Sequence, residues 1–219
     1  MLNKQQILEK AIMALKSEDF TLRYQTLEAL TRELNTLNAC TGRKASAGAF
    51  VKICYETFDD LKNNHRDGLA GVMQAGEMGA VITNTHYILT PYDDEIVKDL
   101  PQAKSPVKPE SILQIITTAA ATENIGHTVV INKKAFLSAC RMHKKAELLK
   151  IDLRYFSIKY LKRFFKASST LEIHIAKKQY QPAFIIADTF EAVLTECRHQ
   201  DADGDLVLVW DIEEDKQNV

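Results

Sequence analysis

The stretch Asn132–Lys166, NKKAFLSACRMHKKAELLKIDLRYFSIKYLKRFFK, sets the expected fold of the second half of the chain. Eleven Lys and Arg residues are opposed only by Glu147 and Asp152, so the stretch carries a net charge of +9. The whole chain of 219 residues carries −1, and the remainder therefore carries −10. A basic region concentrated in this way is the electrostatic footprint of a polyanion-binding surface.

Two amphipathic helices flanking a strand are predicted within this stretch. Asn132 is a suitable N-cap for a helix that runs to about Ala146, and Ser157 caps a second helix, SIKYLKRFFKA. Between them, Leu148–Phe156 alternates as a strand does. At 100° per residue, each helix gathers its positive charges in one arc and places apolar residues elsewhere. The predicted nucleic-acid-binding residues are Lys133, Lys134, Arg141, Lys144, Lys145, Lys159, Lys162, Arg163 and Lys166.

The uniformly positive charge of these helix faces favours contact with a polyanion. A solvated helix face normally mixes charges, often as Glu–Lys pairs four residues apart. Neither of these two helices carries a carboxylate before Glu147. No Gly-rich loop or base-reading Asn or Gln accompanies the basic residues, which predicts nonspecific, salt-sensitive phosphate contacts. The alternative, that both faces are merely solvated, remains open at this stage.

The N-terminal third of the sequence predicts helices. Apolar residues recur at helical spacing in residues 3–16, in a segment from Ser17 or Asp19 to about Asn38, and in residues 47–61. Turn-forming residues 63–68 end the third helix. Residues 1–66 are therefore expected to form a helical segment, and residues 67–219 a clamp-like α+β region.

The rest of the chain is rich in predicted strands. A kink is expected near Asn84, the three prolines in residues 93–110 predict an extended connection, and residues 111–121 predict a short helix. Period-two patterns and turn residues predict strands at 69–75, 80–84, 87–91, 127–131, 171–177, 181–188, 190–198 and 206–212. Helices followed by many short strands indicate the α+β class, with two amphipathic helices packed on an antiparallel sheet.

Motifs for metals, cofactors and catalysis are not evident. The segment Asp201–Asp205 begins like a calcium loop, but Leu206 and Ile212 stand where that loop needs Gly and Glu, so a hairpin turn is expected. The six histidines show no metal-ligand spacing, and no phosphate-loop or nucleophile-elbow motif is found. No two cysteines form a C-x-x-C pair, so reduced, buried thiols are expected at Cys40, Cys54, Cys140 and Cys197. The sequence thus predicts a protein with no catalytic residues, metal or cofactor.

Composition indicates an ordinary globular protein. Apolar residues make up 46% and charged residues 26% of the chain. No run approaches the roughly 18 apolar residues of a membrane span. The polar, periodic start MLNKQQILEKAIMALK lacks the apolar core of a signal peptide. A cytoplasmic location without membrane contact is expected.

The order of elements from His127 onward resembles that of DNA polymerase sliding clamps. SIKYLKRFFKASSTLEIHIAKKQYQPAFIIADTFEAVLTECR is similar to the closing unit of a clamp, with its short helix containing Tyr-Leu, a strand, a strand begun by proline, and a last strand ending in Arg. The matching positions are Tyr160-Leu161, Leu171–Ala176, Pro182–Ile186 and Val193–Arg198. The segment MGAVITNTHYILTPYDDEIVKDLP resembles part of small clamp-like proteins of phages and mobile elements. The resemblance spans about residues 69–198, and it departs from the family at Glu196, where proline is usual.

This resemblance implies a non-catalytic processivity factor. In clamps, the helices present Lys and Arg to the duplex backbone, and the sheets form the outer shell. The implied partners are double-stranded DNA, bound without sequence specificity, a DNA polymerase, and further copies of the chain in a homo-oligomer. The three N-terminal helices have no clear place in the clamp unit, in which only the first or the third could correspond to a clamp helix. The alternative function is a protein-interaction or regulatory module, with the N-terminal helices as its docking surface and the basic face in contact with an acidic partner.

Overall fold

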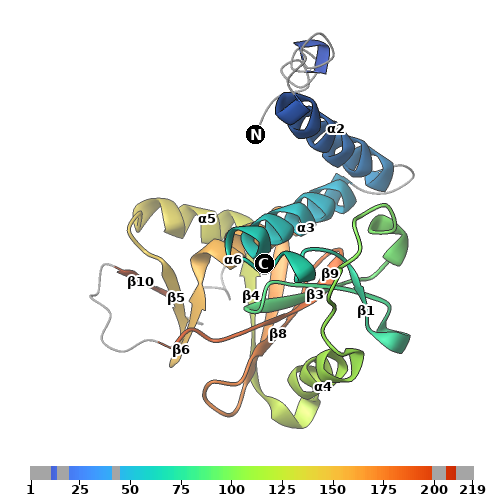
Figure 1. Ribbon diagram of the computed structural model, residues 1–219. Helices are drawn as coiled ribbons and strands as arrows, with labels where there is room; N and C mark the ends of the chain where they lie inside the picture. The colour runs from blue at the N-terminus through green and yellow to red at the C-terminus, as the bar shows by residue number, and fades with distance from the viewer. Residues whose placement is uncertain (1–10, 14–19, 41–44, 199–205, 211–219) are drawn as a thin grey trace.

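The structure, a computed structural model, describes residues 11–13, 20–40, 45–198 and 206–210. It belongs to the α+β class, with a helical N-terminal part, as the sequence predicts (Figure 1). The α-helices are α2 (Phe20–Cys40), α3 (Ala45–Asn63), α4 (Pro109–Ala120), α5 (Lys133–Met142) and α6 (Ile158–Phe164). The strands are β1 (Met73–Gln74), β2 (Ala80–Thr83), β3 (Tyr87–Pro91), β4 (Ile125–Asn132), β5 (Leu148–Ile151), β6 (Arg154–Ser157), β7 (Thr170–Ala176), β8 (Ala183–Ile186), β9 (Phe190–Leu194) and β10 (Val207–Trp210).

The strands form one large and one small sheet. The large sheet has the order β1-β2-β3-β9-β8-β7-β4, and every pairing in it is antiparallel. The small sheet has the order β10-β5-β6, with β10 parallel to β5. The large sheet joins two strands far apart in sequence, since β3 pairs with β9, where Ile88 lies opposite Val193.

Both faces of the large sheet are covered, which the alternation of its side chains makes possible. In β3, Tyr87 and Leu89 face a main core shared with α3, α5 and α6, whereas Ile88 faces a second, smaller core. That second core is closed by α4, through Ile112, Ile116 and Ala119. Figure 1 shows α4 on one side of the sheet, and α3 and α6 on the other.

Helix α3 contributes side chains to the main core, whereas α2 packs on α3 outside that core. Phe50 of α3 is fully buried, and its ring stacks on Phe190 of β9 at 5.2 Å between centroids. No α2 side chain is among the buried hydrophobic residues of either core in the described part of the chain. Figure 1 shows α2 projecting beyond α3. The predicted boundary at residue 66 would therefore separate α3 from the sheet on which it packs.

Three predictions inside the basic stretch are wrong in detail. Ser157 stands at the N-cap of α6, but its side chain makes no capping hydrogen bond. Helix α5 ends at Met142 instead of about Ala146, because the backbone N–H of Glu147 already donates to Leu206 O beside the small sheet. The predicted single strand at 148–156 is a hairpin of β5 and β6. Its two-residue loop turns at Asp152, which has φ +52°, a conformation that aspartate tolerates.

Most other sequence predictions match the structure. The helices around residues 20–38 and 47–61, the helix after Pro109, and the strands of the C-terminal half are confirmed, with ends shifted by a few residues. The predicted helix at 3–16 lies almost entirely outside the described residues, as does the predicted turn at Asp201–Asp205.

Candidate nucleic-acid interface

Helix α5 is held on the protein by its apolar side. The Asn132 side chain caps it as predicted, with Oδ1 accepting a hydrogen bond from the Lys134 N–H at 2.8 Å. Phe136 and Cys140, one turn apart, are buried beneath it. The Phe136 ring lies 4.9 Å from that of Phe165, just past the end of α6, so the two helices share one anchor. This anchoring turns the opposite side of α5 toward solvent.

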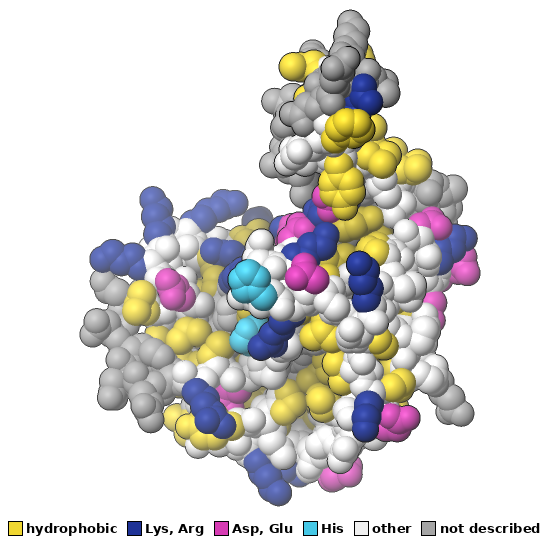
Figure 2. All heavy atoms as spheres, viewed as in Figure 1, with side chains coloured by type: hydrophobic (Ala, Val, Ile, Leu, Met, Phe, Trp, Pro, Cys, Tyr) yellow, Lys and Arg dark blue, Asp and Glu magenta, His cyan; other side chains and the backbone are white. Residues whose placement is uncertain are grey.

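The outward side of α5 and the turn after it carry a cluster of positive charge. Figure 2 shows Lys and Arg side chains gathered over this helix. Lys134, Arg141, Lys144 and Lys145 are exposed, and Lys133 is half-buried. Lys162 of α6 is also exposed, and its helix is joined to α5 through the contact of Phe165 with Phe136.

This cluster is not neutralised by the described part of the protein. We define the α5 patch as five residues for which no ion pair is found among the described residues: Lys133, Lys134, Arg141, Lys144 and Lys162. Like charges that are held together without carboxylates repel one another, and an external anion relieves that repulsion.

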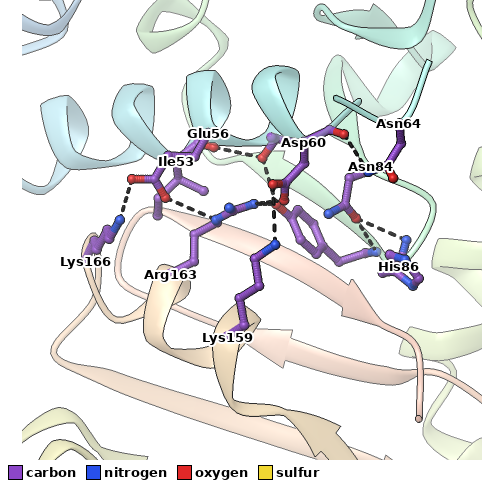
Figure 3. A network of polar contacts seen from close by, with 11 residues as sticks. Ile53, Glu56, Asp60, Asn64, Asn84, His86, Lys159, Arg163 and Lys166 are labelled. Carbon is purple, nitrogen blue, oxygen red and sulfur yellow. Dashed lines mark hydrogen bonds and ion pairs between the residues drawn. The ribbon is translucent and has the colours of Figure 1, made fainter. Parts of the chain in front are cut away.

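The basic face of α6 is different, because it packs against an acidic face of α3 (Figure 3). The Arg163 guanidinium binds both carboxylates there: Nε lies 3.1 Å from Glu56 Oε2, and Nη1 lies 2.8 Å from Asp60 Oδ2. Lys159 Nζ lies 3.4 Å from Asp60 Oδ1, and Lys166 forms an ion pair with Glu56. Two cations of α6 and Lys166 just after it are thus matched by two carboxylates one turn apart on α3.

A buried chain of hydroxyl groups extends this network into the core. Arg163 Nη1 donates to the Tyr87 hydroxyl at 2.7 Å, and that hydroxyl lies 2.8 Å from Thr57 Oγ1. Thr57 Oγ1 in turn donates to the Ile53 carbonyl at 2.8 Å. The Ile53 carbonyl can only accept and takes the one hydroxyl proton of Thr57, so Tyr87 donates to Thr57, and the order of donors runs from Arg163 through Tyr87 and Thr57 to Ile53 O.

The ionisation of these groups follows from their partners. Burial disfavours the charged form of Asp60, but the hydrogen bond and charge of Arg163, with the charge of Lys159, outweigh burial and lower the pKa of Asp60. Burial raises the pKa of Tyr87 to about 12, although Arg163 opposes the rise. Burial alone would lower the pKa of Arg163, yet Tyr87 and Asp60 outweigh it and raise that pKa. The Asp60 carboxylate and the Arg163 guanidinium are therefore both charged at neutral pH.

The structure thus divides the predicted binding residues. Arg163 is 7% exposed and bound to three partners, so its side chain lies in the contact between α6 and α3 and not on the outer surface. Lys159 and Lys166 remain exposed, but their charges are offset by Asp60 and Glu56. Lys162 is included in the α5 patch. Lys145 is also exposed, but it is left out of the patch because it makes an interaction within the protein.

Sequence reasoning missed Glu56 and Asp60. These carboxylates stand four residues apart on one face of α3, and Lys159 and Arg163 show the same spacing on α6. The matching periods were visible in the sequence, but nothing there showed that the two helices are neighbours.

A small hollow of about 270 Å³ lies beside this network. It is lined by Asp60, Asn84, His86, Lys159 and Tyr160, among others. His86 stacks on Tyr160 at 5.5 Å, and the Asn84 side-chain oxygen accepts hydrogen bonds from the backbone N–H groups of His86 and Tyr87. These polar groups are already engaged with one another, so the hollow offers few groups to a ligand.

Among the described residues, no three His, Cys, Asp or Glu side chains converge as a metal site would require. Within the same residues, no helix combines the length and apolar character needed to span a membrane. Comparison with protein-family models, with curated proteins and with solved structures yields no match.

Proposed function

We propose that this protein is a non-catalytic, clamp-like DNA-binding protein that follows the duplex backbone through the α5 patch. The observation that carries the proposal is the patch itself: five exposed or half-buried cations on a rigid, anchored helix and its neighbour, without carboxylate partners among the described residues. The resemblance of residues 69–198 to sliding clamps supports the same function. On this proposal, the protein acts in the cytoplasm as a processivity factor, as part of a homo-oligomer and in contact with a DNA polymerase.

The chemistry of the patch suits phosphates better than bases. Four of its residues are Lys or Arg on one helix and its following turn, and such side chains neutralise backbone phosphates without reading sequence. Each neutralised phosphate contributes about −0.9 to the slope of log K against log salt. Five contacts therefore predict a slope of about −4.5, or about 500-fold weaker binding at 200 mM than at 50 mM salt.

Charge reversal tests the proposal directly. The triple variant K134E/R141E/K144E reverses three exposed residues that make no described ion pair, so the fold should persist. We expect duplex affinity at 50 mM salt to fall by about 100-fold or more, measured by fluorescence anisotropy with duplexes of unrelated sequence. The urea unfolding midpoint should stay unchanged.

A matched control carries the same charge change elsewhere. Lys104, Lys108 and Lys178 are exposed and lie outside α5 and α6, so K104E/K108E/K178E should bind DNA as the native chain does. Equal loss in both triple variants would mean that net charge alone drives binding. Absence of duplex binding at low salt would overturn the proposal. A pull-down complex that survives nuclease would instead favour the acidic protein partner.

A further inference from the structure

Helix α2 exposes an apolar stripe to solvent. Its side chains are far more exposed than surface apolar residues usually are: Phe20 is 83%, Tyr24 69%, Leu27 63% and Leu34 56% exposed. Figure 2 shows hydrophobic side chains gathered along this helix and running down toward the body of the protein. A contiguous exposed apolar surface of this size on a soluble chain usually marks an interaction site.

The stripe has the period of a two-stranded coiled coil. Phe20, Leu27 and Leu34 follow one another at intervals of seven residues, and Tyr24 and Thr31 stand between them at alternating steps of four and three. This is the d and a spacing of a heptad, and Asn38 falls at the next a position. The side chains therefore stay on one narrow seam, as a helix that packs against a similar helix requires.

Contacts with the body hold α2 in place, and the seam stays open to solvent along a groove of about 610 Å³ that Tyr24, Leu27 and Thr31 line together with residues of the body. On the adjacent side of α2, Arg32 forms a two-pronged ion pair with Asp59 of α3, both bonds being 2.8 Å. The Asn35 amide donates to the Tyr55 hydroxyl and to the Asp99 carbonyl, each at 2.9 Å. A helix fixed in this way loses little conformational freedom when a partner binds, which favours association.

We infer that the α2 seam binds the α2 seam of a second copy of this chain, in a parallel two-stranded arrangement. A seam of strict seven-residue period is complementary to itself, because each d-position residue of one copy fits among the seam residues of the other. In parallel register Thr31 lies opposite Thr31 of the other copy, so this polar position meets itself instead of meeting leucine.

The flanking charges and the area agree with this partner. Arg23 and Glu28 stand at the g and e positions, five residues apart, which places Arg23 of each copy beside Glu28 of the other. Glu28 also binds Arg32 at 2.8 Å and lies 3.5 Å from Lys62, so its flank already carries cations and Arg23 adds only modestly. Covering the four apolar side chains on both copies removes on the order of 1,000 Å² from water, about the minimum for a specific interface.

Sedimentation velocity of the full chain tests the inference. We expect a concentration-dependent dimer for the native chain, and a dimer dissociation constant raised about tenfold or more by Leu27→Glu. Gln25→Glu is the matched control, since Gln25 is exposed on the same helix away from the seam and should leave the constant unchanged. The double variant L27E/L34E should be monomeric with an unchanged urea midpoint, because neither leucine is in a buried core.

Cysteine cross-linking tests the register. Phe20→Cys should form a disulfide-linked dimer under mild oxidation, because only a parallel pair brings the two copies of this end residue together. The native chain and Gln25→Cys are the controls for its own cysteines. A monomer at all concentrations, or a dimer that L27E/L34E leaves intact, would overturn the inference. A seam-dependent dimer without the Phe20→Cys link would overturn its parallel register.

Discussion

The packing of α6 against α3 depends on the guanidinium of Arg163. Replacing it with methionine keeps most of the side-chain length but leaves Glu56 and Asp60 with only Lys166 and Lys159 as partners, and leaves Tyr87 without its donor. Removing one member of a buried ion pair usually costs about 3–5 kcal/mol, and the two remaining lysines offset part of that. We expect Arg163→Met to lower the free energy of unfolding by about 2–4 kcal/mol in urea titrations.

The adjacent residue supplies the control. Lys162 is exposed and belongs to the α5 patch, so Lys162→Met should change stability by no more than about 0.5 kcal/mol. The same two variants distinguish an effect on stability from an effect on DNA affinity. Arg163→Met should leave DNA affinity almost unchanged in the folded protein, whereas Lys162→Met should lower it. The opposite pattern would mean that Arg163 reaches the outer surface.

Glu196 is the buried acceptor of a local polar network. Its carboxylate is 2% exposed and accepts hydrogen bonds from Arg154 at 3.2 Å and from the Tyr180 N–H at 2.6 Å. Arg154 also donates to the carbonyls of Ala176 and Lys177. Proline at this position, as the clamp resemblance leads one to expect, could make none of these bonds. Glu196 thus joins the hairpin of β5 and β6 to the turn after β7.

At the scale of elements, the interface of α3 and α6 should respond to acid. The pKa of Asp60 is lowered from its ordinary value of 3.8 on folding, so Asp60 stabilises the folded state fully at pH values above that ordinary value. The contribution is lost as the pH falls through the lowered folded pKa. Asp60→Asn removes it at all pH values. We therefore expect the native chain to be more stable than Asp60→Asn at pH 6, with the difference shrinking as the pH falls below the ordinary pKa of 3.8.

Urea midpoints of both proteins at several pH values provide the measurement. Other carboxylates also titrate in this range, including Glu28, whose pKa is lowered because Arg32 and Lys62 outweigh the effect of burial. The comparison with Asp60→Asn subtracts their effect. A difference between the two proteins that persists unchanged to low pH would show that the Asp60 carboxylate does not contribute through its charge.

The types of most helices and strands could be predicted from the sequence. Some of their ends, and the contacts between distant elements, could not. The apolar spacing of α3 and the alternation of β7 are strong periodic patterns, and both predictions are confirmed. The end of α5 depends on a backbone bond from Glu147 to Leu206, which no local pattern encodes. The hairpin at Asp152 looked like one strand, because Leu149 and Ile151 continue into Leu153 and Tyr155 with the same alternation. Only the structure shows Leu153 exposed at the turn.

For the whole molecule, the charge segregation was predictable but its use was not. The sequence places eleven cations between Asn132 and Lys166, and the structure gives them different partners. Lys159, Arg163 and Lys166 meet acidic residues of α3, about 100 residues away in the chain, whereas Arg154 binds Glu196. The residues of the α5 patch remain on the surface. The strand order of the large sheet, in which β3 pairs with β9, likewise depends on contacts between distant segments.

The organisation of the N-terminal helices leads to a prediction on truncation. A chain beginning at Ala45 loses the Arg32–Asp59 ion pair and the hydrogen bonds of Asn35, but no side chain of either hydrophobic core is known to come from α2. We expect it to unfold cooperatively in urea, with stability reduced by about 1–3 kcal/mol, and to be monomeric because the α2 seam is absent.

A chain that begins at Asp67 lacks α3 as well as α2, and we expect that it does not fold. Phe50, Ile53 and Phe58 are each almost fully buried, and each contributes about 1.5–3 kcal/mol through burial. Losing them with the rest of α3 exceeds the 5–15 kcal/mol by which domains are usually stable, and it also uncovers Tyr87 and Arg163. This shorter chain should lack a cooperative urea transition and a near-ultraviolet circular dichroism signal. If it folded cooperatively, α3 would belong to a separate N-terminal segment ending near residue 66; failure of both truncated chains would instead make α2 part of the folding unit.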